Sequence, residues 1–250
     1  EGDSADTEVV IVGAGISGLA LGRELARRDV PSLTLEAADR PGGVIRTFRD
    51  EGRVLDAGPQ RTRRVGAVAR LIDELALADR TIEAPGDLPL YVYADGRLRR
   101  VPTSLGDWLI GDLLSWRGKL RLLVEPLTRP GGKGETVEAY TVRRLGREAY
   151  ERLVGPLYGG IFGSDPADMP FRPTLGRALE RLGVDRGSLV VAAARWMVGG
   201  TPTPPAISFR DGMETLPRAL YREGRDRIRL ESPVRSLRRA NGGWAAAADG

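Results

Sequence analysis

A glycine-rich turn between an apolar strand and a helix constrains this chain more than any other stretch. The four apolar, β-branched residues Val9 to Val12 predict a buried strand. Gly13, Gly15 and Gly18 follow at the spacing G-x-G-x-x-G, and a helical pattern of apolar residues opens on the third glycine. A second apolar run, at 32–35, predicts the next strand. This strand–helix–strand unit has the context that the dinucleotide-binding fingerprint requires.

Each residue of that fingerprint has a physical role. Gly13 permits the tight turn, Gly15 keeps side-chain atoms away from a pyrophosphate, and Gly18 lets the helix pack on the strand. The helix N-terminus offers free N–H groups to phosphates. Glu36 stands 18 residues after Gly18, where an acid accepts from ribose hydroxyls and disfavours the 2′-phosphate of NADP. The alternative is a glycine-rich turn in an ordinary α/β fold. Further cofactor contacts are expected from the neighbouring residues Ala14, Ile16, Ser17 and Ala37.

The sequence contains neither cysteine nor histidine among its 250 residues. This excludes a disulfide framework, a thiolate nucleophile and a metal site built on Cys or His, and we expect no metal ion. It also excludes a flavin attached covalently through either residue. Proton chemistry must therefore use carboxylates, tyrosine, backbone groups or water. At 41% hydrophobic and 29% charged residues, the composition is that of an ordinary globular protein.

The formal net charge is +4, and nearly all cations are arginine because Lys119 and Lys133 are the only lysines. Two explanations stand side by side: the base composition of the genome, or a preference for carboxylate ligands or anionic lipid. A nucleic-acid partner is not expected, since no zinc knuckle, RNP motif or basic helix with interleaved aromatics occurs in the sequence.

No apolar run reaches about 18 residues, so the sequence predicts no membrane-spanning helix. The acidic start EGDSADTE is unlike a signal peptide. We expect a cytoplasmic protein, with peripheral contact to a membrane as the alternative. Because the chain begins at Glu1 and not at methionine, we expect it to be part of a longer gene product.

A second set of backbone turns follows Glu36. Residues 39–47 read DRPGGVIRT, with turn-forming residues before a glycine pair, and Gly58-Pro59 marks another tight turn. Together with the dinucleotide unit, this order resembles the flavin-dependent amine-oxidase and protoporphyrinogen-oxidase superfamily. The resemblance implies non-covalent FAD, with the glycine pair and the Gly-Pro turn approaching the flavin side. The residues that it places at the cofactor are Arg40, Gly42, Gly43, Val44, Gly58, Pro59, Gln60 and Arg61.

The pattern changes from about residue 85. An Asp95-Gly96 turn between two apolar runs predicts a hairpin, and Ser104 is placed to cap the next helix. The following pair of helices, at 104–128, carries Trp108, Leu109, Leu113 and Trp116 on what we expect to be one apolar face. That face is either the core of a cap domain or a membrane-interface surface, because tryptophan and cations suit a headgroup layer.

The stretch 143–169, RRLGREAYERLVGPLYGGIFGSDPADM, narrows the resemblance to the bacterial protoporphyrinogen and coproporphyrinogen oxidases. In that family this run lies on the substrate side, which places Gly160 against the ring being oxidised, beside Phe162. Leu88 stands where some relatives carry an arginine for a substrate propionate, so Arg63 or another arginine must take that role. The alternative is a helix and loop whose glycines serve close packing.

Residues 201–206, TPTPPA, predict a return linker to the first domain. Beyond it, 208–220 resembles an element that starts a helix near the flavin at Gly212 and Met213, and Val234 matches a position whose backbone binds the adenine. Runs at 234–237 and 244–247 around Asn241-Gly242 predict a hairpin.

We therefore predict an α/β protein with a discontinuous, Rossmann-like FAD-binding domain, 1–84 and 201–250, and an inserted, mainly helical substrate-binding domain, 85–200. The implied reaction is oxidation of protoporphyrinogen IX or coproporphyrinogen III to the porphyrin in haem biosynthesis, with oxygen or another electron acceptor. The alternatives are another flavin amine oxidase or desaturase, and an inactive FAD-binding fragment.

The family's proteins are about twice as long, and their C-terminal part adds a further flavin contact. We expect the isolated chain to bind FAD weakly or not at all and to lack turnover. The motifs leave open which porphyrinogen is the substrate, which acceptor is used and what the oligomeric state is.

Overall fold

The computed structural model describes residues 6–85, 88–129, 134–181, 187–199, 204–240 and 242–249. Part of the expected linker, 201–203, and Asn241 of the expected turn lie outside these ranges. The chain forms two compact units. The first combines Glu1–Gly86 with Pro204–Gly250, and the second is Asp87–Thr203.

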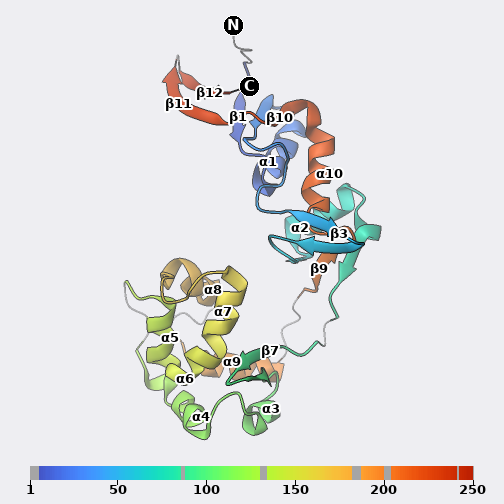
Figure 1. Ribbon diagram of the computed structural model, residues 1–250. Coiled ribbons are helices and arrows are strands. Elements are labelled where there is room, and N and C mark those ends of the chain that lie inside the picture. Colours follow the sequence, from blue (N-terminus) through green and yellow to red (C-terminus); the bar gives the residue numbers. More distant parts are fainter. Residues whose placement is uncertain are drawn as a thin grey trace. The chain divides into compact units, whose positions relative to one another are not determined.

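A three-stranded parallel sheet organises the first unit. Its strand order is β1 (Val9–Val12), β2 (Ser32–Leu35) and β10 (Ile228–Arg229). Val9 pairs with Ser32, and Ile228 pairs with Thr34. Both strands predicted around the glycine turn are confirmed, and β10 shows that the C-terminal segment completes their sheet (Figure 1).

Helix α1 (Ile16–Ala26) connects β1 to β2, as expected of a strand–helix–strand unit. The prediction that it opens on Gly18 is wrong, because Gly15 is the extended N-cap and Ile16 is already helical. Gly18 therefore lies in the first turn of the helix. A Cβ atom at residue 18 would stand 2.0 Å from the Gly13 carbonyl oxygen, so only glycine permits this approach of helix to strand.

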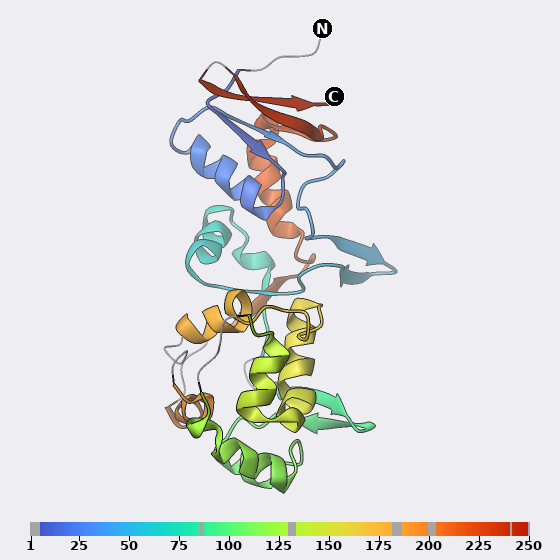
Figure 2. The same ribbon diagram turned by 90° about the vertical axis from the view of Figure 1, so that its left-hand side faces the viewer.

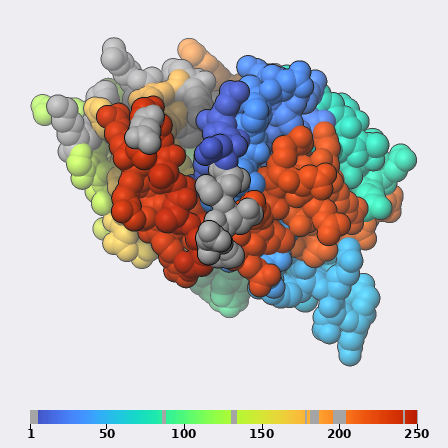
Figure 3. All heavy atoms as spheres, turned by 90° about the horizontal axis from the view of Figure 1, so that it is seen from above, coloured from blue at the N-terminus to red at the C-terminus, as the bar shows by residue number. Residues whose placement is uncertain are grey.

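Antiparallel pieces complete the first unit. Strands β3 (Thr47–Asp50) and β4 (Arg53–Asp56) form a hairpin that projects from the unit's surface (Figure 3). A second sheet has the order β5 (Thr62–Arg63), β9 (Ala206–Phe209) and β6 (Thr81–Glu83). Helix α2 (Gly66–Glu74) and the turn η1 (Ala78–Arg80) connect β5 to β6.

Helix α10 (Thr215–Gly224) supplies the core that joins these pieces. It packs on α1 (Figure 2), and its Leu220 joins a buried cluster with Ala14 and Leu19. The helix begins at Thr215, two residues after the expected Met213, because Gly212 takes a left-handed turn (φ +87°) first. A second cluster is built from Ile45, Ile72, Leu77, Ile207, Phe209, Met213 and Leu216.

The chain then enters η5 (Arg225–Arg227), β10 and a long hairpin. This hairpin, β11 (Val234–Ala240) with β12 (Gly243–Ala248), confirms the pairing predicted around residue 241, and both strands are longer than expected. A register irregularity follows Val234.

The second unit is mainly helical, and its hairpin of β7 (Tyr91–Ala94) and β8 (Arg97–Arg100) turns at Asp95-Gly96 as predicted. Ser104 and Thr136 cap helices through their hydroxyls, which confirms Ser104 as a cap. The helical elements are α3 (Leu105–Ile110), α4 (Trp116–Leu123), η2 (Glu125–Leu127), α5 (Val137–Leu145), α6 (Arg147–Ala149), η3 (Tyr150–Val154), α7 (Gly155–Phe162), η4 (Arg172–Gly176), α8 (Arg177–Arg181) and α9 (Leu189–Gly199).

A buried ion pair fastens the helices of the second unit. Glu125 is fully buried and pairs with Arg144 of α5. Its carboxylate also accepts from the hydroxyl of Ser188 and from the backbone N–H of Leu189, at 3.1 Å, at the start of α9. Arg144 in turn donates to the carbonyl oxygen of Thr128 at 2.8 Å. One carboxylate thus joins η2, α5 and α9.

Replacing this carboxylate should weaken the fold strongly. Glu125→Ala leaves a buried guanidinium without its charge partner and uncaps α9, so we expect a loss of about 3–5 kcal/mol in unfolding free energy. Glu24→Ala, which removes an exposed i,i+4 pair with Arg28, should cost at most about 0.5 kcal/mol. Urea unfolding followed by circular dichroism compares the two, and similar midpoints would contradict the structural role of Glu125.

Candidate functional site

The glycine turn after β1 presents an open backbone surface. Gly13 has a positive φ of +97°, and its N–H donates to the Leu35 carbonyl oxygen at 2.7 Å. A Cβ atom at Gly15 would meet no heavy atom within 4 Å, whereas one at Gly18 would collide with backbone. Gly18 is therefore required by packing within the protein. Gly15 instead borders free space, as a residue beside a bound phosphate must.

The N-terminus of α1 opens at the same place. The N–H groups of Ile16, Ser17 and Gly18 belong to the first helical turn, which has no intrahelical acceptors. They add the positive end of the helix dipole to the space beside Gly15. The turn and the helix start together make an anion-binding surface.

Glu36 does more than the sequence predicted. Its carboxylate accepts from the N–H of Ala14 at 2.6 Å and from the N–H of Ala38 at 2.9 Å. It therefore holds the glycine turn against the end of β2, and each oxygen keeps a lone pair for a further donor. Ala14 is fully buried, so only its backbone can contribute to a site. Ala37 is exposed beside Glu36.

The second glycine pair lies against the first turn. Gly42 donates to the Ala14 carbonyl oxygen at 2.8 Å and forms a parallel bridge with Gly15. A Cβ atom at Gly43 would stand 3.4 Å from the Gly15 Cα. Both residues have positive φ, of +106° and +58°. Two sequence motifs separated by more than twenty residues thus become one surface.

Arg40 has a structural task that its sequence position did not show. Its guanidinium donates to the carbonyl oxygens of Gly43, at 2.8 Å, and Pro41, at 3.3 Å. It therefore holds the glycine-pair loop in shape. Val44, the next expected contact, is exposed.

The Gly-Pro turn lies beside this loop. A Cβ atom at Gly58 would be 2.1 Å from the Val44 carbonyl oxygen, so these backbones touch. Pro59, Gln60 and Arg61 are exposed. The three glycine-containing segments after β1, β2 and β4 are therefore brought together, as the site requires.

The segment leading to Val234 runs along the end of β2. Glu36 donates its N–H to the Arg229 carbonyl oxygen at 2.9 Å, and Ser232 donates to the Glu36 carbonyl oxygen at 2.8 Å. Val234 follows two residues later and starts β11. The expected adenine-side valine is thus on the segment that flanks the expected ribose acid.

The expected substrate residues are divided between the units. Arg63 lies on β5 of the first unit and donates to the Pro204 carbonyl oxygen at 2.6 Å. Gly160 and Phe162 lie on α7 of the second unit, where a Cβ atom at Gly160 would meet nothing within 4 Å. The Phe162 ring is half-exposed and lies 5.0 Å from the Tyr158 ring, between centroids. Burial raises the pKa of Tyr158, so its phenol is protonated at neutral pH.

The expected apolar face of α3 and α4 is wrong as a single face. Trp108 packs against the buried Leu114, and Leu113 is buried, whereas Leu109 and Trp116 point to solvent. The buried Lys119 ammonium donates to the carbonyl oxygens of Leu109 and Gly111, both at 2.8 Å. Trp108 therefore packs in the core of the second unit, whereas Trp116 lies on its surface.

A family model described as flavin containing amine oxidoreductase matches residues 16–250. The chain belongs to this family. Protoporphyrinogen oxidases are similar to it: the chloroplastic enzymes of Nicotiana tabacum and Oryza sativa subsp. japonica are 29% and 31% identical over 97% and 98% of this chain. The protoporphyrinogen oxidase of Homo sapiens is 31% identical over 85% of the chain. The chain spans about half the length of these relatives, 47%, 49% and 50%.

Solved structures of flavin amine oxidoreductases and related proteins share the fold. A protein from Exiguobacterium sp. 255-15, named only provisionally as a protoporphyrinogen oxidase, aligns with a TM-score of 0.73 and 25% identity. The alignment covers 99% of this chain and 57% of that one. A putrescine oxidase aligns with a TM-score of 0.69 and 20% identity, over 98% of this chain and 55% of that one. At this identity the likeness shows a shared fold and nothing further.

The first unit fits the flavin cofactor that family membership implies. The space at Gly15, the N–H groups of α1 and the free lone pairs of Glu36 are the groups that hold a pyrophosphate and a ribose. In the described ranges, no set of three or more acidic side chains is placed to hold a metal ion.

Gly15→Val should abolish flavin binding while leaving the fold intact. The free space around this Cβ position admits a branched side chain, but that side chain occupies the place of a phosphate. Gly106→Val, in α3, is the control because its Cβ position also has room. In a chain of the relatives' full length, we expect native circular dichroism for both variants and loss of flavin absorbance for Gly15→Val alone. Equal flavin contents would contradict the assignment of the turn.

Glu36→Ala should weaken FAD binding by about 10- to 100-fold, since a charged acceptor of ribose hydroxyls is worth about 1.5–3 kcal/mol. The variant also releases the Ala14 N–H that holds the turn. Titration of FAD into the wild-type protein and into Glu36→Ala, followed by quenching of flavin fluorescence, measures the change in the FAD dissociation constant. Glu24→Ala serves as the surface control, and an unchanged dissociation constant for Glu36→Ala would refute the ribose role.

Proposed function

We propose that the first unit binds FAD without a covalent bond. The observation that carries this proposal is the meeting of three backbone turns, at Gly15, Gly43 and Gly58, around open space beside Glu36. The turn and α1 would hold the pyrophosphate, Glu36 the adenosine ribose, and the Val234 segment the adenine. The glycine-pair and Gly-Pro loops would face the flavin side.

We propose further that the protein to which this chain belongs oxidises a porphyrinogen to a porphyrin, as its similarity to protoporphyrinogen oxidases suggests. When bound, FAD supplies the two-electron acceptor for each of three successive oxidations, and molecular oxygen takes up the electrons as hydrogen peroxide. The 143–169 signature supports a porphyrinogen over an amine or a polyene. Coproporphyrinogen III and protoporphyrinogen IX remain equal candidates.

The second unit, on this proposal, holds the substrate. The half-exposed Phe162 ring and the open side of Gly160 offer an apolar surface for a tetrapyrrole. Arg63 belongs to the first unit, where it uses one of its five N–H donors on the Pro204 carbonyl and keeps others for an anionic group. With no histidine in the sequence, the released protons pass to carboxylates, backbone or water.

Two measurements test this function together. An absorption spectrum reports bound flavin, and porphyrin fluorescence after addition of each porphyrinogen reports turnover, with amines as the competing substrates. The 250-residue chain and a chain of the relatives' full length should be compared. We expect turnover of a porphyrinogen and not of amines from the longer chain, and weak FAD binding without turnover from the shorter one. Amine oxidation alone would refute the substrate class.

An exposed apolar stripe supports a second proposal, peripheral membrane contact through the second unit. Trp116, Leu120, Leu123 and Leu127 follow helical spacing along α4 and η2, and each is more than 60% exposed. The exposed Arg117 has no ion pair among the described residues. Tryptophan and leucine on one face with a nearby cation are typical of helices that lie in a lipid interface.

None of the helices in the described ranges combines the length and apolar character needed to cross a bilayer. Contact would therefore be interfacial.

Two tryptophans provide a matched test of this surface. Trp116 and Trp244 are 68% and 67% exposed, and each lies over a cation, Lys119 and Arg239 respectively. We expect flotation with anionic vesicles at low salt, lost for Trp116→Ser and kept for Trp244→Ser. Equal flotation of both variants would argue against the α4 stripe.

A further inference from the structure

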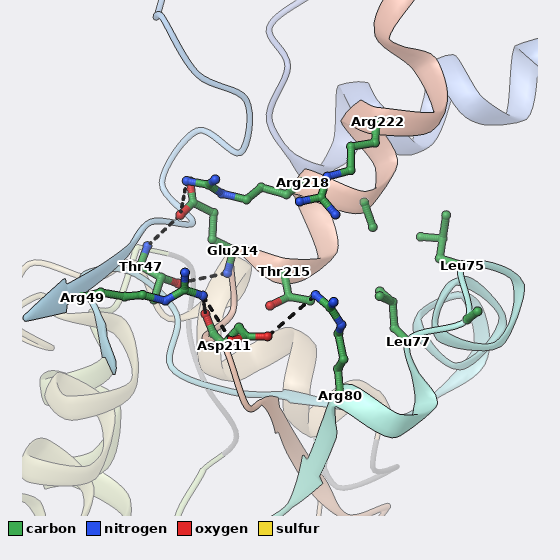
Figure 4. Close-up of a pocket in the computed structure, with 12 residues that line it drawn as sticks. Thr47, Arg49, Leu75, Leu77, Arg80, Asp211, Glu214, Thr215, Arg218 and Arg222 are labelled. Atoms are coloured by element: carbon green, nitrogen blue, oxygen red, sulfur yellow. Dashed lines mark hydrogen bonds and ion pairs between the residues drawn. The ribbon is translucent and has the colours of Figure 1, made fainter. Parts of the chain in front are cut away.

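A cavity of about 790 Å³ lies in the first unit, apart from the three glycine turns. It is bounded by β3, the end of α2 with η1, and the first two turns of α10. Its size is within the range of small-molecule sites. Twelve residues line it: Thr47, Arg49, Leu75, Ala76, Leu77, Arg80, Asp211, Glu214, Thr215, Arg218, Ala219 and Arg222 (Figure 4).

The lining carries more positive than negative charge. Four arginines face two acids, Asp211 and Glu214. Asp211 pairs with Arg49 at 3.3 Å and more loosely with Arg80 at 3.7 Å. Glu214 pairs with Arg218 at 3.2 Å and accepts from the Thr47 N–H at 3.4 Å. Both acids are thus engaged, and two positive charges remain in excess.

Three donors in this cavity are free or nearly so. Arg222 makes no ion pair or side-chain hydrogen bond with any described residue. Arg80 stands beyond hydrogen-bond distance of Asp211. Thr215 is 9% exposed, and its hydroxyl has no hydrogen-bond partner in the described part of the chain. Figure 4 shows the Arg222 and Arg80 guanidinium groups reaching toward each other from α10 and η1, with Thr215 between them.

This arrangement places like charges together without a ligand. Figure 4 shows the Arg222 and Arg80 guanidinium groups turned toward each other, and no acid among the described residues pairs with Arg222. An anion between Arg222 and Arg80 would offset their mutual repulsion and would also accept from the Thr215 hydroxyl. Leu75, Leu77 and Ala219 supply an apolar wall to the same cavity.

We propose that this cavity binds a phosphate monoester with a compact apolar or flat substituent. A planar carboxylate is satisfied by one arginine fork, whereas a phosphoryl group presents three oxygens in different directions. Arg222 and Thr215 of α10 and Arg80 of η1 approach from different directions, which matches the three oxygens of a phosphoryl group. The apolar wall would cover the ester substituent.

The cavity is lined by none of the residues proposed to hold the pyrophosphate or the ribose, and its Asp211, Glu214 and Thr215 belong to the 208–220 element that the family resemblance places near the flavin. No residue of the 13–18, 42–44 or 58–61 segments lines it, and its arginines touch none of the cofactor groups described above. The proposal therefore stands or falls separately from the proposed oxidase function.

Calorimetric titration of the 250-residue chain with phenyl phosphate, inorganic phosphate and benzoate tests the assignment. We expect saturable binding of phenyl phosphate, weaker binding of inorganic phosphate, and the weakest binding of benzoate. Arg222→Gln and Arg80→Gln should each raise the phenyl phosphate dissociation constant by about tenfold, as loss of a charge-assisted bond implies. Arg28→Gln, at an exposed residue just beyond the C-terminal end of α1, should change this dissociation constant by less than about twofold.

Gly15→Val distinguishes this cavity from the phosphate-binding turn and should leave phenyl phosphate affinity unchanged. Absence of saturable binding to the wild-type chain would overturn the proposal. So would loss of binding in Gly15→Val, or equal effects of Arg222→Gln and Arg28→Gln. Benzoate binding as tight as phenyl phosphate would overturn the phosphate assignment.

Discussion

The contact between Gly18 and the Gly13 carbonyl is the constraint on which the cofactor side of this protein depends. Because no side chain separates them, the first turn of α1 lies directly on the end of β1. That approach aims the free N–H groups of the helix into the space bordered by Gly15. Glu36 then fixes the turn from the neighbouring strand, and Gly42 does so from the following loop. A larger residue at position 18 would push the first turn of α1 away from β1 and so disturb its contacts with the glycine turn, with Glu36 and with Gly42.

Several arginines of this chain bind backbone carbonyls, beside the many that pair with carboxylates. Arg40 shapes the glycine-pair loop, Arg121 donates to the Arg143 carbonyl at 2.7 Å, and Arg144 holds the Thr128 carbonyl. Guanidinium suits this task because its donors diverge in a plane.

The sequence predicted those features of the fold that depend on residues close together in the chain. Strands β1 and β2 and the hairpins β7–β8 and β11–β12 followed from apolar runs and turn residues, and family membership followed from motif order. The sequence predicted Glu36 as the ribose acid from its spacing after Gly18. Its hydrogen bond from the Ala14 N–H was not predicted, because it depends on the distance between the end of β2 and the glycine turn, which sequence spacing does not encode. The split between Trp108 and Trp116 was missed because tertiary packing decides which side of a helix is covered. Glu125 and the arginine-lined cavity were missed because their partners are far apart in sequence.

The parallel pairing of β10 with β2 has a consequence for biosynthesis. Ile228 lies 194 residues after its partner Thr34. At about 5–20 residues per second, a ribosome needs roughly 10–40 s to bridge that interval. During this time the second unit, which is continuous in sequence, emerges whole and can fold, while β2 waits for its neighbour. The inserted unit therefore has the opportunity to be native first, and the N-terminal strands are the natural clients of chaperones on the ribosome.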